Sequence, residues 1–335
     1  MHIARASELA HAELTAICDL REDLAQAVGT EFNVPYLTKD ARELIARTDL
    51  DAIVLALPTA YRFELAQKVL RSGKHLLLEK PAAMDTSQLA VLRELQGDLK
   101  IGCCSCRLSK SRAVAAARQA FLDGRIGKLL KVHCRALAPA GAAPSEPPPH
   151  WRLKRAVNGG GIFVNWGCYD LDFLFSVIDW NLSELVSVTA HTWKMPPDFL
   201  AHQAEGSDAE THISLFAEYK DGLVVQYERA ERATTRKEDT WQIIGDKGSL
   251  HLNMLDVNAP VLIDSTDPQQ GVLSDTLHHE DEPDYDQHAV PIDDFCRAIQ
   301  EDRPPQTSIE RSMILQALTD ATYKAADSSR PVVFA

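Results

Sequence analysis

The sequence predicts an α/β domain with a parallel sheet, followed by an α+β domain built on an open antiparallel sheet. Between Glu13 and Cys103, short apolar strands alternate with amphipathic helical patterns, which is typical of a parallel sheet covered on both faces. Farther along, longer segments containing Thr, Val and Tyr are separated by turn sequences, which indicates antiparallel hairpins. Because 335 residues are enough for two domains, we expect them at residues 1–108 and 109–335.

Strands and helices of the first domain can be placed from the apolar pattern. The expected strands are ELTAIC (13–18), a weak PYL (35–37), DAIVLALP (51–58), KHLLLE (74–79) and LKIGCC (99–104). The helical patterns between them lie near 22–30, 40–48, 61–72 and 86–96. Gly73 is suited to end a helix directly before the next strand. We expect ligands between the two domains, at the carboxyl ends of the parallel strands.

The second domain begins with a helix near 111–124 and continues as strands. They read KLLKVHCRAL, ELVSVTAHTW, THISLFAEY, GLVVQYER, TWQIIG and SLHLNM, with hairpin turns at YKDGLV and GDKGSL. A Pro/Ala loop at 138–150 and a long acidic segment at 265–288 interrupt this pattern, and we expect the acidic segment to lie on the surface. The chain ends with helices at 291–301 and 308–327 and the strand PVVF.

Charge and hydropathy argue against two classes of protein. A net charge of −13 disfavours nucleic-acid binding, because a phosphate backbone requires a basic face. No apolar run approaches the roughly 20 residues of a membrane span, and the N-terminus lacks the basic-then-apolar plan of a secretory signal. We therefore expect a cytoplasmic protein that binds neither nucleic acid nor membrane.

Cysteine and histidine patterns give no metal signature. The 7 cysteines are an odd number scattered through apolar segments, so a disulfide framework is not expected. The CCSC cluster at 103–106 is better explained as a buried strand end than as reactive or metal-binding thiols, since no second Cys/His pair follows at zinc-finger spacing. His278, His279 and His288 lie among acids and are typical of a solvated charge run. We expect no metal site.

The segment GKHLLLEKPAAM, residues 73–84, is the first candidate for chemistry. Its apolar strand ends in Glu79-Lys80-Pro81, which brings an ammonium group to the carboxyl edge of the sheet. Lys80 could orient a substrate hydroxyl and lower the pKa of a neighbouring acid, and Glu79 could accept hydrogen bonds from a ribose or hold the lysine. A surface salt bridge at a strand end explains this segment equally well.

A second candidate is NGGGIFVNWGCYDLDFLFSVIDW, residues 158–180. Its three glycines are not placed or spaced as in a dinucleotide loop, so we reject a phosphate cradle. Asn165, Tyr169 and Asp172 follow at i, i+4 and i+7, which places them on one face of a helix. The alternative is helix capping together with a buried tyrosine.

These features together resemble the Gfo/Idh/MocA family of NAD(P)-dependent oxidoreductases of sugars, polyols and related compounds. The resemblance covers nearly the whole chain. It rests on an Asp-ended strand, the blocks LALPTAYRFELAQKVLRSGKHLLLEKP and GRIGKLLKV, the GGG-x3-N-x-G-x-Y-x-x-D helix, and the tail IDDFCRAIQEDRPPQTSIERSMILQAL. It implies an N-terminal Rossmann-like domain, a small sugar-like substrate, and a homo-dimer or homo-tetramer formed through the antiparallel sheet.

The resemblance also implies roles for the candidate residues. Lys80 is the EKP lysine that contacts nicotinamide ribose and substrate, and Tyr169 occupies the position of the proton-transfer histidine found in most members. Tyrosine is a recurring variant there, in glucose-fructose oxidoreductase among others. A phenol of pKa about 10 becomes competent if the Lys80 cation stabilises its phenolate. Asn165 replaces an aspartate and is assigned to substrate binding, and Asp172 either contacts substrate or has a structural role.

Further positions follow from the same resemblance. The central strand ends where the family's backbone passes under the cofactor, at Leu57, Pro58 and Thr59. Arg62 stands about where a histidine is frequent. Candidate substrate residues are Arg107, Trp151 and Arg152, although an arginine in a solvated salt bridge is as good an explanation.

Asp19 decides the expected cofactor. An acid at this strand end accepts both ribose hydroxyls and repels a 2′-phosphate, which favours NAD, whereas Arg21 could pair with the phosphate and leaves NADP possible. Such an acid lies about 20 residues beyond a Gly-x-Gly-x-x-Gly loop. Asp19 has only 18 residues before it and the first glycine is Gly29. We therefore expect a chain without the family's first strand and glycine-rich loop, through a start codon assigned too far downstream or a real deletion.

The sequence and its family resemblance leave three possible functions. The first is an active NAD(P)-dependent oxidoreductase of a sugar, polyol or related hydroxy compound, with Lys80 and Tyr169 in proton transfer. The second is a cofactor-impaired relative that binds a ligand or partner without redox turnover, as the expected loss of the loop would allow. The third is hydrolysis of a glycoside with transient use of bound nicotinamide, which some relatives perform.

Overall fold

The computed structural model describes residues 2–146, 149, 151–256, 258–280 and 286–334. Its internal contacts divide the chain into two units. Unit 1 consists of Met1–Arg107 and Asp286–Met313, and unit 2 consists of Leu108–Tyr285 and Ile314–Ala335. The structure thus groups 286–313, which the sequence analysis assigned to the second domain, with the first unit.

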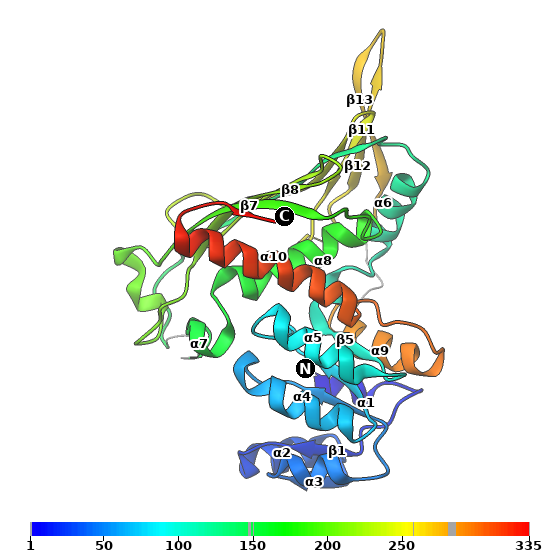
Figure 1. Cartoon of the computed structure of the whole chain (residues 1–335), viewed down its shortest axis with the longest axis vertical. Helices are drawn as coiled ribbons and strands as arrows, with labels where there is room; N and C mark the ends of the chain where they lie inside the picture. Colours follow the sequence, from blue (N-terminus) through cyan, green and yellow to red (C-terminus); the bar gives the residue numbers. More distant parts are fainter. Residues whose placement is uncertain (1, 147–148, 150, 257, 281–285, 335) are drawn as a thin grey trace. The chain divides into compact units, whose positions relative to one another are not determined.

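Unit 1 contains the predicted parallel strands, coloured blue to cyan in Figure 1. One parallel pair is formed by β1 (Ala16–Cys18) and β2 (Tyr36–Thr38). A second parallel sheet has the order β3 (Ala52–Leu55), β4 (His75–Leu78) and β5 (Ile101–Cys103). The predicted parallel α/β architecture is confirmed, and each expected strand of this domain is present.

Helices of unit 1 start and end where the local sequence dictates. They are α1 (His2–Ser7), α2 (Glu22–Glu31), α3 (Ala41–Ala46), α4 (Arg62–Arg71), α5 (Thr86–Gln96) and α9 (Val290–Gln300). Asp40 caps α3 by accepting the N–H of Arg42, and Asp85 caps α5 by accepting the N–H of Gln88. After α4, Gly73 takes a φ of +76°, which a residue with a side chain rarely adopts.

Strand β4 is covered on both faces because its side chains alternate. Leu76 and Leu78 lie in an apolar cluster with residues of α4 and α5. Leu77, between them, packs in a separate cluster with Ile292 and Phe295 of α9. A strand buried on both faces needs a continuous apolar run, which the three consecutive leucines supply.

Unit 2 is built on a sheet of nine strands among the described residues, in the order β13-β12-β11-β10-β6-β9-β8-β7-β14. The strands are β6 (Leu129–Pro139), β7 (Leu185–Trp193), β8 (His212–Tyr219), β9 (Val224–Ala233), β10 (Glu238–Gly245), β11 (Gly248–Leu252), β12 (Val261–Asp267), β13 (Gly271–His278) and β14 (Val332–Val333). Neighbouring strands are antiparallel except β6 and β9, which run parallel in the middle. The predicted antiparallel sheet is therefore mixed at its centre.

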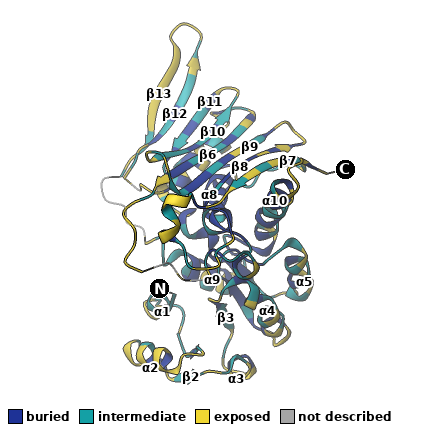
Figure 2. Ribbon diagram, turned by 90° about the vertical axis from the view of Figure 1, so that its left-hand side faces the viewer, coloured by how far each residue is buried: buried dark blue, intermediate teal, exposed yellow. Residues whose placement is uncertain are grey.

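Part of the acidic segment 265–288, which was expected to interrupt the strands, forms strands itself. Residues up to 278 form the hairpin of β12 and β13, whose partners include Asp264↔Ser274 and Thr266↔Val272. Figure 2 shows β13 as exposed, in agreement with the expected surface position. Residues 281–285 lie outside the described part of the chain.

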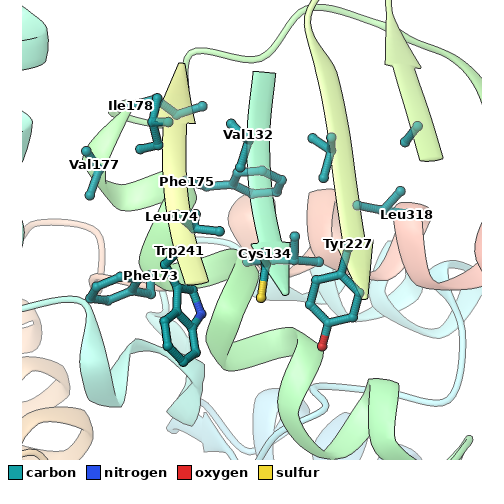
Figure 3. Packing of buried hydrophobic residues seen from close by; sticks show 14 of the residues in the cluster. Val132, Cys134, Phe173, Leu174, Phe175, Val177, Ile178, Tyr227, Trp241 and Leu318 are labelled. Atoms are coloured by element: carbon teal, nitrogen blue, oxygen red, sulfur yellow. The ribbon is translucent and has the colours of Figure 1, made fainter. Parts of the chain in front are cut away.

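One face of the large sheet carries the core of unit 2. Helices α6 (Arg112–Leu122), α8 (Cys168–Val177) and the later turns of α10 (Ile309–Ser328) share one apolar cluster with the strands. Figure 3 shows Trp241, Cys134 and Tyr227 side by side on β10, β6 and β9, with residues of α8 and α10 beside them. Among the described residues, no helix is both long and apolar enough to cross a membrane.

Candidate active site

In unit 1, the candidate cofactor residues lie at the ends of two neighbouring strands. Leu57, Pro58 and Thr59 follow β3, and Glu79 and Lys80 follow β4. The strands are parallel hydrogen-bonded neighbours, and the Glu79 N–H still donates to the carbonyl of Leu55 at 3.2 Å. The structure therefore brings these two groups together at one carboxyl edge, where open α/β sheets bind ligands.

Arg62 holds the Glu79-Lys80-Pro81 turn in place. Its guanidinium is buried, with 2% of the residue exposed. It donates to the carbonyls of Glu79 and Lys80, to that of Pro81 at 2.6 Å, and to the hydroxyl of Thr59 at 2.7 Å. From the sequence, Arg62 was identified only as standing about where a histidine is frequent in the family. The Arg62 guanidinium has several N–H donors and bonds residues that follow β3 and residues that follow β4. The spacing of residues in the sequence does not reveal these contacts.

Replacing Arg62 with methionine is expected to lower the free energy of unfolding by about 3 kcal/mol, because buried carbonyls lose a charged donor. Urea unfolding measures this loss. Arg71→Met, on the exposed end of the same helix, is the matched control and should change stability little. Equal stability of the two variants would show that the Arg62 contacts do not hold the turn.

Glu79 is already engaged within unit 1. Its Oε1 lies 2.6 Å from Nε2 of His2, and its Oε2 accepts the backbone N–H of Lys80 at 2.9 Å. Burial raises the pKa of Glu79, but the hydrogen bond and charge of His2, together with the N–H and charge of Lys80, outweigh burial and lower it overall. Glu79 is therefore an ionised acceptor bonded to the backbone of Lys80, and its binding of a ribose stays a prediction.

Asp19 has the position expected of a ribose-binding acid. It directly follows β1 and is half-buried, and its N–H donates to the carbonyl of Thr38 on β2. Its Oδ1 accepts the N–H of Arg21 at 2.8 Å. The Arg21 side chain is exposed and lies 3.4 Å from Asp23. A carboxylate fixed at a strand end fits an NAD ribose, whereas Arg21 is paired with another acid and offers weaker support for a 2′-phosphate.

In unit 2, the candidate proton-transfer residue lies on a helix with an irregular start. Phe163–Gly167 forms a π-helical turn that continues directly into α8. Asn165 lies in this wider turn, while Tyr169 and Asp172 lie in α8, so the regular helix expected through all three begins only at Cys168. Tyr169 and Asp172 are buried and Asn165 is half-buried. Single π turns often occur at functional sites.

The three glycines before this helix allow close packing and do not form a phosphate cradle. A Cβ on Gly161 would stand 1.8 Å from the carbonyl oxygen of Glu210, and one on Gly160 would stand 1.9 Å from the Tyr323 hydroxyl. The Glu210 carboxylate accepts the N–H groups of Gly161 and Phe163 and the hydroxyl of Tyr323. Burial raises the pKa of Glu210 in spite of these donors. The rejection of a phosphate cradle agrees with this packing.

Asp170, which the sequence analysis did not select, anchors α8 to the sheet. It is fully buried and accepts hydrogen bonds from Arg229 at 2.7 Å, from the Tyr227 hydroxyl at 2.9 Å and from the Trp241 indole at 2.9 Å. The Arg229 guanidinium also lies 4.3 Å from the ring centre of Trp166. Figure 3 shows Tyr227 and Trp241 on either side of β6.

Trp166 connects this anchor to Tyr169. The two rings meet edge to face with centroids 6.0 Å apart. Asp170, Arg229, Trp166 and Tyr169 thus form a continuous contact path within unit 2. Nothing in the sequence distinguishes Asp170 from Asp172, because the partners of Asp170 lie 57 to 71 residues away.

The remaining predicted substrate residues belong to different units. Arg107 is half-buried at the end of unit 1. Trp151 and Arg152 are in unit 2, where Trp151 is exposed and Arg152 lies 3.4 Å from Glu231. The salt-bridge alternative is therefore present for Arg152, and binding of substrate by these residues stays a prediction.

Two family models match the chain. A model described as an oxidoreductase family with an NAD-binding Rossmann fold matches residues 1–97. A model of the GFO/IDH/MocA C-terminal domain matches residues 114–251. The chain belongs to the Gfo/Idh/MocA oxidoreductase family. The predicted resemblance is confirmed, and the two matches include Asp19, Lys80, Asn165, Tyr169 and Asp172.

Known Gfo/Idh/MocA proteins are similar over almost the whole chain. Inositol 2-dehydrogenase of Rhizobium meliloti (strain 1021) is 26% identical over 340 residues, covering 100% of this chain and 96% of the relative. D-glucoside 3-dehydrogenase of Escherichia coli (strain K12) is 23% identical over 331 residues, covering 96% of this chain and 90% of the relative.

Solved structures show the same Gfo/Idh/MocA fold. An oxidoreductase domain protein from Kribbella flavida gives a TM-score of 0.83 at 20% identity, covering 100% of this chain and 95% of the other. Levoglucosan dehydrogenase in complex with NADH gives a TM-score of 0.82 at 20% identity, covering 99% of this chain and 95% of the other. The fold class predicted from the sequence is confirmed, and the chain is an oxidoreductase with an NAD-binding domain.

Proposed function

We propose that the protein is an NAD-dependent dehydrogenase or reductase of a sugar, a polyol or a related hydroxy compound. The observation that carries the proposal is the Glu79-Lys80-Pro81 turn at the carboxyl edge of a parallel sheet, fixed by Arg62 and Glu79. The inositol and glucoside dehydrogenases among its relatives support this class of substrate. The proposed domains are residues 1–108 for cofactor binding and 109–335 for substrate binding and association.

NAD⁺, which Asp19 and the residues at the ends of β3 and β4 would hold, would supply the hydride acceptor for oxidation of a carbinol carbon. The substrate hydroxyl must lose its proton in the same step, and the proposed acceptor is the Tyr169 oxygen. A phenol serves as a base near neutral pH only where a cation favours its phenolate, and Lys80 is assigned that role. In the reductive direction the Tyr169 hydroxyl returns the proton to the carbonyl oxygen. Asn165 is proposed to orient a second substrate hydroxyl through its amide.

Asp19 is proposed to select NAD over NADP. Replacing Asp19 with alanine should remove an acceptor for the ribose hydroxyls and a repulsive charge toward the 2′-phosphate. We expect the ratio of NADPH to NADH dissociation constants to fall about tenfold or more, in line with one lost charged hydrogen bond. Fluorescence titration with each cofactor measures this ratio. Glu31→Ala, which removes an exposed acid at the far end of α2, is the control. An unchanged ratio in Asp19→Ala would assign selectivity elsewhere.

Association through the large sheet is part of the proposal. Phe216 is 42% exposed and Trp193 is 44% exposed. Phe216 alternates along β8 with Leu215 and Ala217 of the core, so it points to the opposite face. A homo-dimer or homo-tetramer that covers this face is proposed, and light scattering after size exclusion tests it. A cytoplasmic location stays a prediction.

The alternatives without redox turnover are less well supported. Dehydrogenases among the relatives do not favour a cofactor-impaired binding protein. No contact in the described residues points specifically to glycoside hydrolysis. The test is a panel of inositols, aldoses and 1,5-anhydro sugars with NAD⁺, followed by NADH absorbance and by chromatography for released sugar. Formation of NADH with one oxidised product supports the proposal, and release of a free sugar without net NADH would contradict it.

A further inference from the structure

Three side chains from distant parts of the sequence converge in unit 1. They are His2 of α1, Glu79 after β4 and Cys104 after β5. The Nε2 of His2 lies 2.6 Å from Oε1 of Glu79 and 4.0 Å from Sγ of Cys104. All three ligand atoms lie within 4.8 Å of one another.

The imidazole nitrogen that each group contacts distinguishes a nucleophilic thiol from a cation-binding site. In a nucleophilic thiol–histidine–acid arrangement, the thiol and the acid contact opposite nitrogens of the imidazole ring. Here both contact Nε2, while Nδ1 has no hydrogen-bond partner among the described residues. The three groups therefore point to one shared position, as ligands of a cation do, and not along a proton relay.

The donor set selects the kind of cation. Imidazole, thiolate and carboxylate are the groups that bind Zn²⁺, whereas Mg²⁺ and Ca²⁺ prefer oxygen alone. Cys104 is buried, but the side chains of His2 and Glu79 remain 19% and 28% exposed. Solvent can thus reach the position and supply a fourth ligand.

We propose that His2, Glu79 and Cys104 bind one Zn²⁺ ion, with water as the fourth ligand. Binding converts the Cys104 thiol to a thiolate and releases its proton to solvent. This site differs from the expectation of no metal, and no spacing in the sequence indicates it, since Glu79 and Cys104 lie 77 and 102 positions from His2.

Zinc at this position has a consequence that rests on the proposed function. Glu79 is a candidate cofactor residue, expected to accept hydrogen bonds from a ribose of the proposed NAD, and its Oε1 is the zinc ligand in this proposal. A bound ion therefore competes with the cofactor, and zinc acts as an inhibitor of the enzyme, reversed by a chelator.

Co²⁺ provides a spectroscopic test on the full-length, reduced protein without cofactor. A cobalt thiolate absorbs in the near ultraviolet, so we expect this band to saturate at one equivalent of Co²⁺ and to disappear when Zn²⁺ is added. Cys104→Ser should abolish the band, and His2→Gln should weaken Zn²⁺ binding by at least roughly 100-fold, as expected for loss of a direct ligand. Cys106→Ser, a buried thiol of the same segment outside the trio, is the control and should retain the band.

Several results would overturn the proposal. They are the absence of a saturable band, an undiminished band in Cys104→Ser, or unchanged Zn²⁺ affinity in His2→Gln. The His2→Gln variant should fold normally, because His2 lies on a short, partly exposed helix. Because these measurements need no cofactor, their failure is separate from failure of the proposed dehydrogenase. If Zn²⁺ binds as expected but does not weaken NADH binding, the zinc site stands and the assignment of Glu79 to the ribose is wrong.

Discussion

Tyr169→Phe is expected to lower kcat by about 10³-fold, the usual contribution of one general acid–base group, while the dissociation constant for NADH stays unchanged. Only the hydroxyl is removed. The ring keeps its edge contact with Trp166 and its buried place in α8. Steady-state kinetics with the best substrate of the panel and an NADH titration measure the two effects separately.

Two further variants make the Tyr169 test specific. Tyr219→Phe, in a buried strand of the same unit, should retain full activity. Tyr169→His introduces the residue that most family members have at this position, and it should restore part of the rate with a lower optimum pH, since imidazole titrates near pH 6.5. A phenylalanine variant with near-normal kcat would remove Tyr169 from the mechanism.

Asp170→Ala is expected to lower the free energy of unfolding by about 3–5 kcal/mol, because it leaves the Arg229 guanidinium buried without its carboxylate. The Tyr227 hydroxyl and the Trp241 indole lose the same acceptor. Urea unfolding followed by tryptophan fluorescence measures the loss. Glu184→Ala is the control, since its ion pair with Lys220 is exposed and is worth about 0.2–1 kcal/mol.

Replacing both Asp170 and Arg229 separates the effect of this ion pair on stability from its effect on catalysis. Asp170→Leu with Arg229→Met leaves no buried charge, so the double variant should be more stable than Asp170→Ala alone. If the path from Arg229 through Trp166 also positions Tyr169, the double variant should still have a reduced kcat with unchanged NADH binding. A loss below about 1 kcal/mol in Asp170→Ala would show that Asp170 does not anchor α8.

The sequence predicted those helices and strands whose type and limits depend on their own residues and immediate neighbours. Strand β4 has leucine at its three buried positions, 76 to 78, which is the apolar run that a strand buried on both faces requires. The segment 86–96 was expected as a helix and forms Thr86–Gln96, because Asp85 supplies a cap directly before it. Asp19 and Lys80 could be selected for the same reason, since each directly follows a predicted strand.

Features that sequence did not predict depend on distant partners. Strand β13 has mostly exposed side chains, so it lacks the apolar alternation that identifies a half-buried strand, and only its pairing with β12 defines it. The π-helical turn at Phe163–Gly167 adjoins the close packing of Gly161 on Glu210, 49 residues away. Arg62 and Asp170 act through partners on other elements, and the sequence shows only two ordinary polar residues.

The most direct measurement is a calorimetric titration of the full chain with NADH, because it requires no knowledge of the substrate. The account predicts saturable binding at one site per chain, with a dissociation constant within the range of about 1 μM to 1 mM usual for enzyme ligands, and weaker binding of NADPH. An absence of heat with both NADH and NADPH at millimolar concentration would contradict the account, since no hydride transfer could then be assigned to this protein.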